Sequence, residues 1–166
     1  CAACGGEAPP EHALDDAALG AAITYEPAAA QAERPCTLIS ARDAQALTGR
    51  PFFDALATNK VDGARIRCAL AVGDGAMQGL VQLDVLLPDA FLDQDAVLAR
   101  QCRPGAVQPP TLARPACLTL EGAYAGLIGG RVYIAAVRRE PGRINQALSL
   151  RLLDMVTPRI AQSSKS

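Results

Sequence analysis

The sequence predicts an α+β domain in which an antiparallel sheet of about five strands, built from hairpins, packs against two or three helices. Two observations lead to this fold class. Residues 65–72 and 77–87 alternate apolar and polar side chains, which is the pattern of half-buried strands. Residues 141–160 instead place apolar side chains at helical spacing, which predicts a long C-terminal helix.

Composition limits the classes of function. A chain of 166 residues that is 50% hydrophobic suffices for one domain with a core. Its 16 Lys and Arg nearly balance 17 Asp and Glu, so no net field attracts a polyanion and we expect no nucleic-acid partner. Aromatic residues make up 4% of the chain and none is Trp, which argues against stacking platforms for bases or sugars.

The leading residues predict a lipid anchor. The sequence begins Cys1-Ala2-Ala3-Cys4 rather than with Met, and it resembles a mature bacterial lipoprotein, in which the Cys after the cleavage site is acylated. The resemblance implies a lipid on Cys1 that holds the chain on a cell-envelope membrane, facing the periplasm or the exterior, and on the outer membrane if the host has one. Two or three acyl chains give stable attachment, because each buried methylene contributes about 0.8 kcal/mol.

Cys1 and Cys4 also form a C-x-x-C pair, for which redox chemistry or zinc binding is the alternative. Redox pairs normally sit at a helix N-terminus after a strand, and a zinc site needs further ligands. The one histidine, His12, lies in the same leading segment. We therefore favour lipidation of Cys1 and expect neither a metal nor a cofactor, while the fate of Cys4 stays open.

The predicted domain lies between two less ordered segments. Residues 1–34 hold few large apolar side chains, so we expect a flexible, lipid-anchored tether that spans roughly 30 Å. The one helix that we consider there covers residues 15–22, with Asp15 as its cap. The domain is predicted over residues 35–162, and residues 163–166 are predicted to be a disordered tail.

The first helix of the domain is predicted to follow Ser40. Ser40 and Asp43 have the spacing of a capping box, in which each side chain bonds the other residue's backbone N–H. Gly49 suits the left-handed position after the last turn, and Arg50-Pro51 ends the helix.

The two alternating strands, residues 65–72 and 77–87, are predicted to form one hairpin through the glycine-rich residues 73–75. Gln82 and Asp84 alternate with the apolar side chains, so we expect one face of the sheet to be solvated. We interpret Asp84 as a solvated acid rather than a catalytic one.

A second helix is predicted from Pro88-Asp89 to Cys102, with Asp89 as its cap. Acidic side chains early in this helix and basic ones late match the helix dipole, so we assign them a structural role. They are Asp93, Asp95, Arg100 and Arg103.

Strands over residues 116–121, 124–128 and 131–137 follow, and the last two are joined at Gly129-Gly130 as a hairpin. Within the final helix, Pro158 should cause a kink or the end of the helix, because it lacks the backbone N–H.

Four cysteines lie within the domain. We prefer the local bridges Cys36 to Cys68 and Cys102 to Cys117, although four cysteines allow three pairings. Loops of these lengths contribute about 3 to 4 kcal/mol each in the chain-entropy model. Such bridges imply an oxidising compartment.

A short motif resembles the DUF3558 family, small cysteine-containing envelope lipoproteins of actinobacteria. In that family a Pro-Cys-x-Leu-[Leu/Ile] stretch opens a short helix that ends near Gly, and a second Cys lies in the next strand. The matching residues are Pro35, Cys36, Leu38, Ile39, Gly49 and Cys68. The order of elements also matches over residues 35–160. The resemblance implies an extracytoplasmic lipoprotein of unknown activity.

No pattern in the sequence predicts a catalytic centre. Triad chemistry needs a positioned imidazole, and His12 lies in the predicted tether. Carboxylates that the fold could gather are Asp54, Asp62, Asp74, Asp84 and Glu121. Arg138, Arg139 and Arg143 surround a turn and are candidates for contact with an anion or a partner, although a solvated charged loop is the favoured interpretation.

Three hypotheses of function follow. We favour a non-enzymatic envelope lipoprotein that binds a protein partner or a small ligand through one face or groove of its sheet. The second is an envelope hydrolase that uses clustered carboxylates. The third is an inhibitory or structural protein that acts through exposed loops such as residues 103–115. An apposed pair of acids in a pocket would favour the second.

Overall fold

The computed structural model describes residues 34–52, 58–70, 81–88, 91–109, 114–140 and 142–163. One antiparallel sheet forms its centre, with the strand order β1-β2-β3-β6-β5-β4 and with β7 paired to β6. The strands are β1 (Thr58–Asp62), β2 (Arg65–Leu70), β3 (Val81–Leu86), β4 (Ala116–Leu118), β5 (Tyr124–Ile128), β6 (Arg131–Glu140) and β7 (Arg143–Ile144). The predicted α+β class is confirmed.

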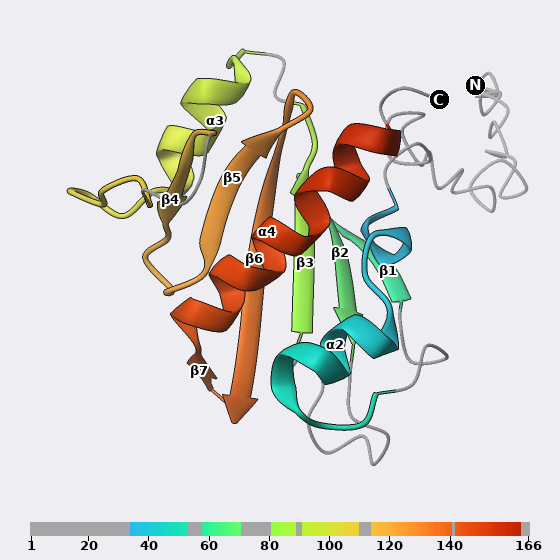
Figure 1. Ribbon diagram of the computed structural model, residues 1–166. Coiled ribbons are helices and arrows are strands. Elements are labelled where there is room, and N and C mark those ends of the chain that lie inside the picture. The colour runs from blue at the N-terminus through green and yellow to red at the C-terminus, as the bar shows by residue number, and fades with distance from the viewer. Residues whose placement is uncertain are drawn as a thin grey trace, which may run out of the picture.

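Helices lie on both faces of the sheet. The helical elements are η2 (Pro35–Thr37), α2 (Ala41–Thr48), α3 (Gln94–Gln101) and α4 (Gln146–Ser163). The long helix α4 crosses the front of the sheet in Figure 1, with α2 below it and α3 at the opposite upper edge. No helix among the described residues has both the length and the hydropathy to cross a membrane.

Two apolar clusters follow from the alternation of side chains along the strands. Tyr133, Ala135 and Val137 of β6 belong to the larger cluster, which includes Leu152 and other buried residues of α4. The intervening side chains of β6 face the other way and join Val97 and Leu98 of α3 in the smaller cluster. They are Val132, Ile134 and Ala136. The sheet is therefore covered on both faces, and among the described residues α3 packs mainly against β5 and β6.

The position of α2 agrees with the prediction from its capping residues. Ser40 Oγ accepts a hydrogen bond from the Asp43 backbone N–H, and the Asp43 carboxylate accepts one from the Ser40 backbone N–H. Gly49 follows the helix at φ 73°, a left-handed conformation that glycine adopts without a steric cost.

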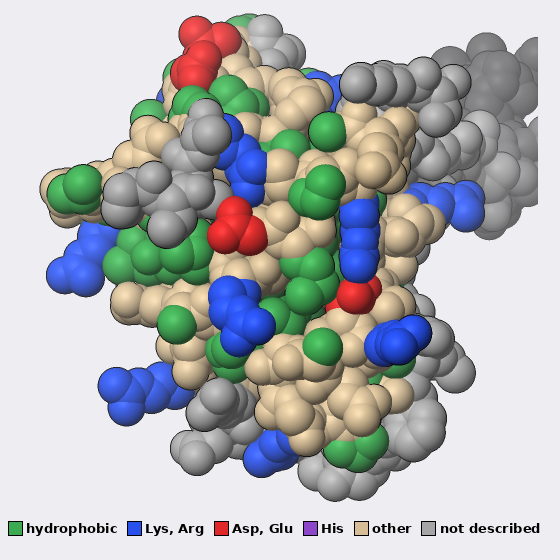
Figure 2. Space-filling view, viewed as in Figure 1, with side chains coloured by type: hydrophobic (Ala, Val, Ile, Leu, Met, Phe, Trp, Pro, Cys, Tyr) green, Lys and Arg blue, Asp and Glu red, His purple; other side chains and the backbone are tan. Residues whose placement is uncertain are grey.

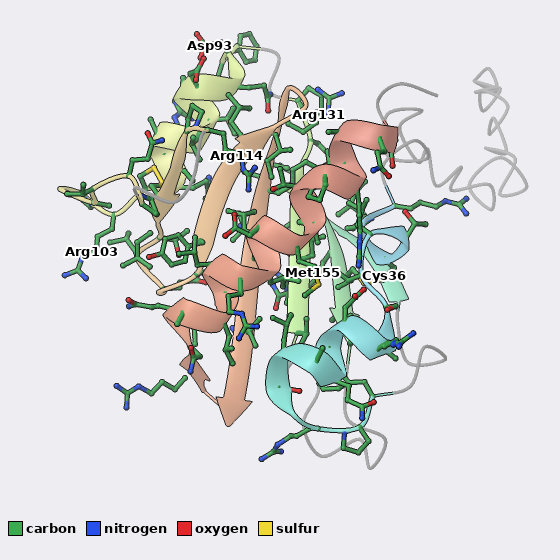
Figure 3. All side chains as sticks on the ribbon, in the orientation of Figure 1. Cys36, Asp93, Arg103, Arg114, Arg131 and Met155 are labelled. Carbon is green, nitrogen blue, oxygen red and sulfur yellow. A yellow bond between two sulfur atoms is a disulfide. The ribbon has the colours of Figure 1, made fainter. Side chains whose placement is uncertain are left out.

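The start of α3 was predicted too early. The helix begins at Gln94, and the cap is Asp93, whose Oδ1 accepts a hydrogen bond from Ala96 N at 2.7 Å. Figure 3 shows Asp93 at this end of α3. Both Asp89 and Asp93 are good cap residues in sequence. Val97 and Leu98 pack into the smaller cluster, and this contact with the core supports the helix that Asp93 caps.

Both ends of α4 differ from the prediction. Its first turn begins after Asn145, whose Oδ1 accepts a hydrogen bond from Leu148 N, while Arg143–Ile144 pairs with β6 as a strand. Pro158 lies inside the helix, which continues to Ser163, one residue into the predicted tail. Ile160 is buried in the larger cluster and stabilises the turn beyond Pro158.

Other predicted elements are confirmed in part. The β2–β3 and β5–β6 pairings hold, and Gly129 and Gly130 both have positive φ in the β5–β6 turn. Strand β4 is shorter than the predicted 116–121, and β1 was not predicted. The tether, its helix at residues 15–22 and the glycine-rich turn 73–75 lie outside the described residues.

The predicted disulfide pairing is present. Cys36 is bonded to Cys68, which ties η2 to β2, and Cys102 is bonded to Cys117, which ties the end of α3 to β4. Each bridge joins a helical element to the sheet, so each restricts how that element moves over the sheet.

Candidate functional site

The sheet face that carries α3 is only partly covered. Towards β3 and β2 this face carries polar side chains instead of a helix. Arg65 and Arg67 of β2 lie opposite Leu86 and Asp84 of β3 in the antiparallel register. The predicted solvated face is thus replaced by two regions, an apolar one under α3 and a charged one beside it.

Asp84 is the centre of the charged region and is 1% exposed. Arg67 donates to both of its oxygens, from Nε and from Nη2, at 3.0 Å each. Gln82 Nε2 lies 3.1 Å from both oxygens. The interpretation of Asp84 as a solvated acid is wrong, because side chains from two strands replace its water shell. A bidentate Arg holds a buried carboxylate in a fixed position.

Arg65 is held much less tightly than Arg67. Its Nη1 lies 3.4 Å from Asp84 Oδ2, and its side chain is 38% exposed. In the part of the chain that the structure describes, this long contact is the only ion pair of Arg65. The guanidinium group therefore has donors to offer a ligand.

A groove runs between α3 and the adjoining ends of β2 and β3. Its volume is about 670 Å³, within the range of small-molecule sites. Six of its nine described lining residues are leucine, proline, valine or alanine. The described lining residues are Ala64, Arg65, Leu86, Leu87, Pro88, Leu92, Val97, Arg100 and Gln101.

The charged side chains among the described lining residues are of one sign. Arg65 enters from the β2 end and Arg100 from the last turn of α3. Arg100 is exposed and makes no side-chain hydrogen bond within the described ranges. No acidic side chain is among the described lining residues. An apolar wall with two guanidinium groups suits a ligand that has an apolar body and an anionic group.

A second, more open hollow of about 850 Å³ lies between η2, the start of α2 and the end of α4. Its polar groups bond one another. Arg159 donates to both oxygens of Asp43, at 2.6 and 2.9 Å, and to the Leu38 carbonyl oxygen at 2.7 Å. This arrangement lowers the pKa of Asp43 from 3.8 to about 2, chiefly through the Arg159 hydrogen bond. We assign the hollow a structural role.

The arginines predicted to contact an anion lie elsewhere. Arg138 on β6 and Arg143 on β7 flank the turn between these strands, Arg138 half-buried and Arg143 exposed. The side chain of Arg139 lies outside the described residues. None of the three is among the described lining of the groove. Their role stays a prediction. On the face covered by α4 and α2, Lys and Arg side chains are scattered rather than gathered into one patch (Figure 2).

The described carboxylates do not converge. Asp84 lies in the middle of β3, whereas Glu121 is exposed in the turn between β4 and β5, with β6 and β5 between the two positions. Asp54, Asp74 and the side chain of Asp62 lie outside the described part of the chain. Among the described residues, no group of three or more His, Cys, Asp or Glu side chains could hold a metal ion.

The loop between α3 and β4 projects from the domain. Arg103 extends outward in Figure 3, and Val107 is 85% exposed. The Cys102 to Cys117 bridge closes the base of this loop, and Gln108 donates a hydrogen bond to the Arg114 carbonyl oxygen. These features leave the hypothesis of a loop-borne interaction open as a prediction.

Sequence reasoning missed the groove for a specific reason. In the sequence, Arg100 matches the helix dipole and Arg65 stands at the start of a strand, and neither position by itself indicates a ligand site. A usable signal was present, because Arg65 and Arg67 alternate with apolar residues and thus lie on the same face of β2. Arg65 contributes to a groove only together with α3, and α3 is distant from β2 in the sequence.

No protein-family model, curated protein or solved structure matches this chain. The resemblance to the DUF3558 family therefore stays a prediction.

Proposed function

We propose that this chain is a non-enzymatic binding protein that holds an amphipathic anion in the groove between α3 and the β2–β3 hairpin. The observation that carries the proposal is the combination, in one groove, of an apolar wall with the guanidinium groups of Arg65 and Arg100. The apolar wall favours the body of the ligand and the arginines favour its charged end, so the two features specify one class of ligand.

The energies are adequate for measurable binding. Half-burying an eight-carbon chain contributes about 3 kcal/mol, and pairing with a partly exposed Arg adds about 1 to 2 kcal/mol. The cost of association takes up part of this gain. We expect dissociation constants of the order of 1 mM for simple eight-carbon probes.

The proposed place of action is the cell envelope. Two disulfides support an oxidising compartment, since such bonds are rare in a reducing cytosol. We also propose that a lipid on Cys1 attaches the chain to the membrane. The intact mass of protein purified from the host membrane tests this. An acyl adduct on Cys1 is expected, and a bare Cys1 in the soluble fraction would contradict it.

The absence of Trp from the sequence permits a clean binding assay. In a Leu92→Trp variant the fluorescence reports on the groove alone. Octyl sulfate should shift the emission in a saturable way, and octyl glucoside, which has the same chain and a neutral head, should bind about tenfold more weakly.

A Val107→Trp variant is the matched control, because Val107 is exposed on the projecting loop and does not line the groove. Its emission should not respond at the same concentrations. Equal affinity for the two probes, or an equal response at both reporter positions, would show that the groove does not select amphipathic anions.

A further inference from the structure

The charged groups around the groove do not balance. Asp84 is buried between the strands and takes both of its strongest contacts from Arg67, so these two charges cancel. Arg65 contacts the same carboxylate only at 3.4 Å. In the register between β1 and β2, Asp62 lies opposite Arg65 and Lys60 lies opposite Arg67, so β1 adds one charge of each sign beside them. Arg100 reaches the groove from α3 without an acidic partner in the described ranges. The four basic and two acidic residues of this cluster therefore leave two net positive charges beside the groove.

The position of each charge is set by its surroundings. Arg67 cannot turn towards the groove without leaving a buried carboxylate with no bidentate partner, which is costly. Arg65 can turn, because Asp84 keeps its Arg67 and Gln82 contacts when Arg65 moves away. Arg65 is thus the adjustable cation of the cluster and Arg67 the fixed one.

From this we infer that the groove prefers a doubly charged head group, a phosphate monoester, over a singly charged one of the same shape. The inference rests on the proposed function, since it names the head group of the same amphipathic ligand. A phosphate monoester presents three oxygens to two guanidinium groups and carries nearly two charges at neutral pH. A sulfate ester has the same tetrahedral shape but a single charge, so it matches only one of the two arginines.

The expected preference is substantial. At a partly exposed site one additional ion pair should raise the affinity by about tenfold. It should also depend on pH through the ligand, because the dianion of a phosphate monoester takes up a proton at about pH 6 and becomes a monoanion. Below that pH the phosphate and the sulfate carry the same charge, and the preference should fade.

The test compares octyl phosphate with octyl sulfate by isothermal titration calorimetry on the unmodified protein. We expect octyl phosphate to bind about tenfold more tightly at about pH 8, and the two probes to bind within about twofold at about pH 5. Octyl sulfate keeps its charge over this range, so it controls for titration of the protein. Glycerol phosphate, which has the head group without the chain, should bind at least about tenfold more weakly than octyl phosphate.

Variants assign the effect to residues. Arg65→Gln and Arg100→Gln should each remove most of the phosphate preference, whereas Arg151→Gln should keep it, because Arg151 is exposed on α4 and does not line the groove. Circular dichroism of each variant establishes that it is folded.

The outcomes separate the two claims. Equal affinity for both octyl probes at about pH 8 overturns the head-group inference and leaves the amphipathic groove intact. Failure of both octyl probes to bind overturns the proposed function and the inference with it. If Arg151→Gln loses the phosphate preference as much as the groove variants do, the effect comes from overall charge and the assignment to the groove is overturned. If glycerol phosphate binds as tightly as octyl phosphate, the inference that the ligand carries an apolar chain is overturned.

Discussion

The ion pair between Asp43 and Arg159 should make the domain sensitive to acid in a predictable way. It joins the first turn of α2 to the last part of α4 through two hydrogen bonds of 2.6 and 2.9 Å. The carboxyl of Asp43 has a pKa of about 2 in the folded chain against an ordinary value of 3.8. We consider the variant Asp43→Asn, which removes the charge at nearly constant size.

The size of the effect follows from the shift in pKa. A difference of about 1.8 pKa units corresponds to about 2.5 kcal/mol if none of it is screened. The Arg159 side chain is 39% exposed, so water weakens the pair. We therefore expect Asp43→Asn to lower the free energy of unfolding by about 1 to 2 kcal/mol at neutral pH. Because the folded pKa lies below the unfolded one, this contribution is complete above about pH 4 and disappears as the pH falls towards 2.

Urea unfolding followed by far-ultraviolet circular dichroism at pH values between about 7 and 2 measures this difference. The variant Arg159→Gln is the control, because it removes the ion pair and leaves the Ser40 capping box in place. The double variant should lose less than the sum of the two single losses, by about 1 kcal/mol. A stability difference between Asp43→Asn and the parent that stays constant from neutral to acid pH would refute this reasoning.

Three other predictions concern the stability of the domain. Replacing Cys36 and Cys68 together by Ala should lower the free energy of unfolding by about 3 to 4 kcal/mol, since the bond closes a long loop; a loss below about 1 kcal/mol in urea unfolding would contradict this. Gly126→Ala should lower the melting temperature, because the new Cβ would lie 3.0 Å from Leu153 Cδ2 of α4. We expect a cost of about 1 kcal/mol in the free energy of unfolding. An unchanged melting temperature would count against the close approach of α4 to β5. Asp84→Asn should cost about 2 kcal/mol, because Arg67 loses its charged partner, and a variant as stable as the parent in chemical denaturation would show that the Asp84 cluster contributes little.

Features that depend on neighbouring residues in sequence could be predicted. The capping box of α2 is contained in four consecutive residues, and Gly49 supplies the left-handed turn that ends the helix. The alternation in β2 and β3 identified both the strands and the side chains that face the larger cluster. The preferred disulfide pairing followed from the order of these elements.

Features that depend on distant neighbours could not. Asp84 looks like a solvated acid in sequence, and its burial follows from Arg67, which the hairpin brings beside it. The helix α4 continues past Pro158 because Ile160 and Arg159 have partners in the larger cluster and in α2. In the same way the groove exists only where α3 lies against the β2–β3 end, so no single segment of sequence encodes it.

The central claim is that the groove between α3 and the β2–β3 hairpin binds an amphipathic anion. Two-dimensional ¹H–¹⁵N nuclear magnetic resonance of the labelled protein, titrated with octyl phosphate, tests it most directly. We predict saturable shifts for the backbone amides of Arg65, Leu92 and Arg100 and for the Nε–H groups of the two arginines, while amides of α4 such as that of Arg151 stay unchanged. Shifts confined to α4 or to the loop at Val107, or no saturable shift anywhere, would contradict the account.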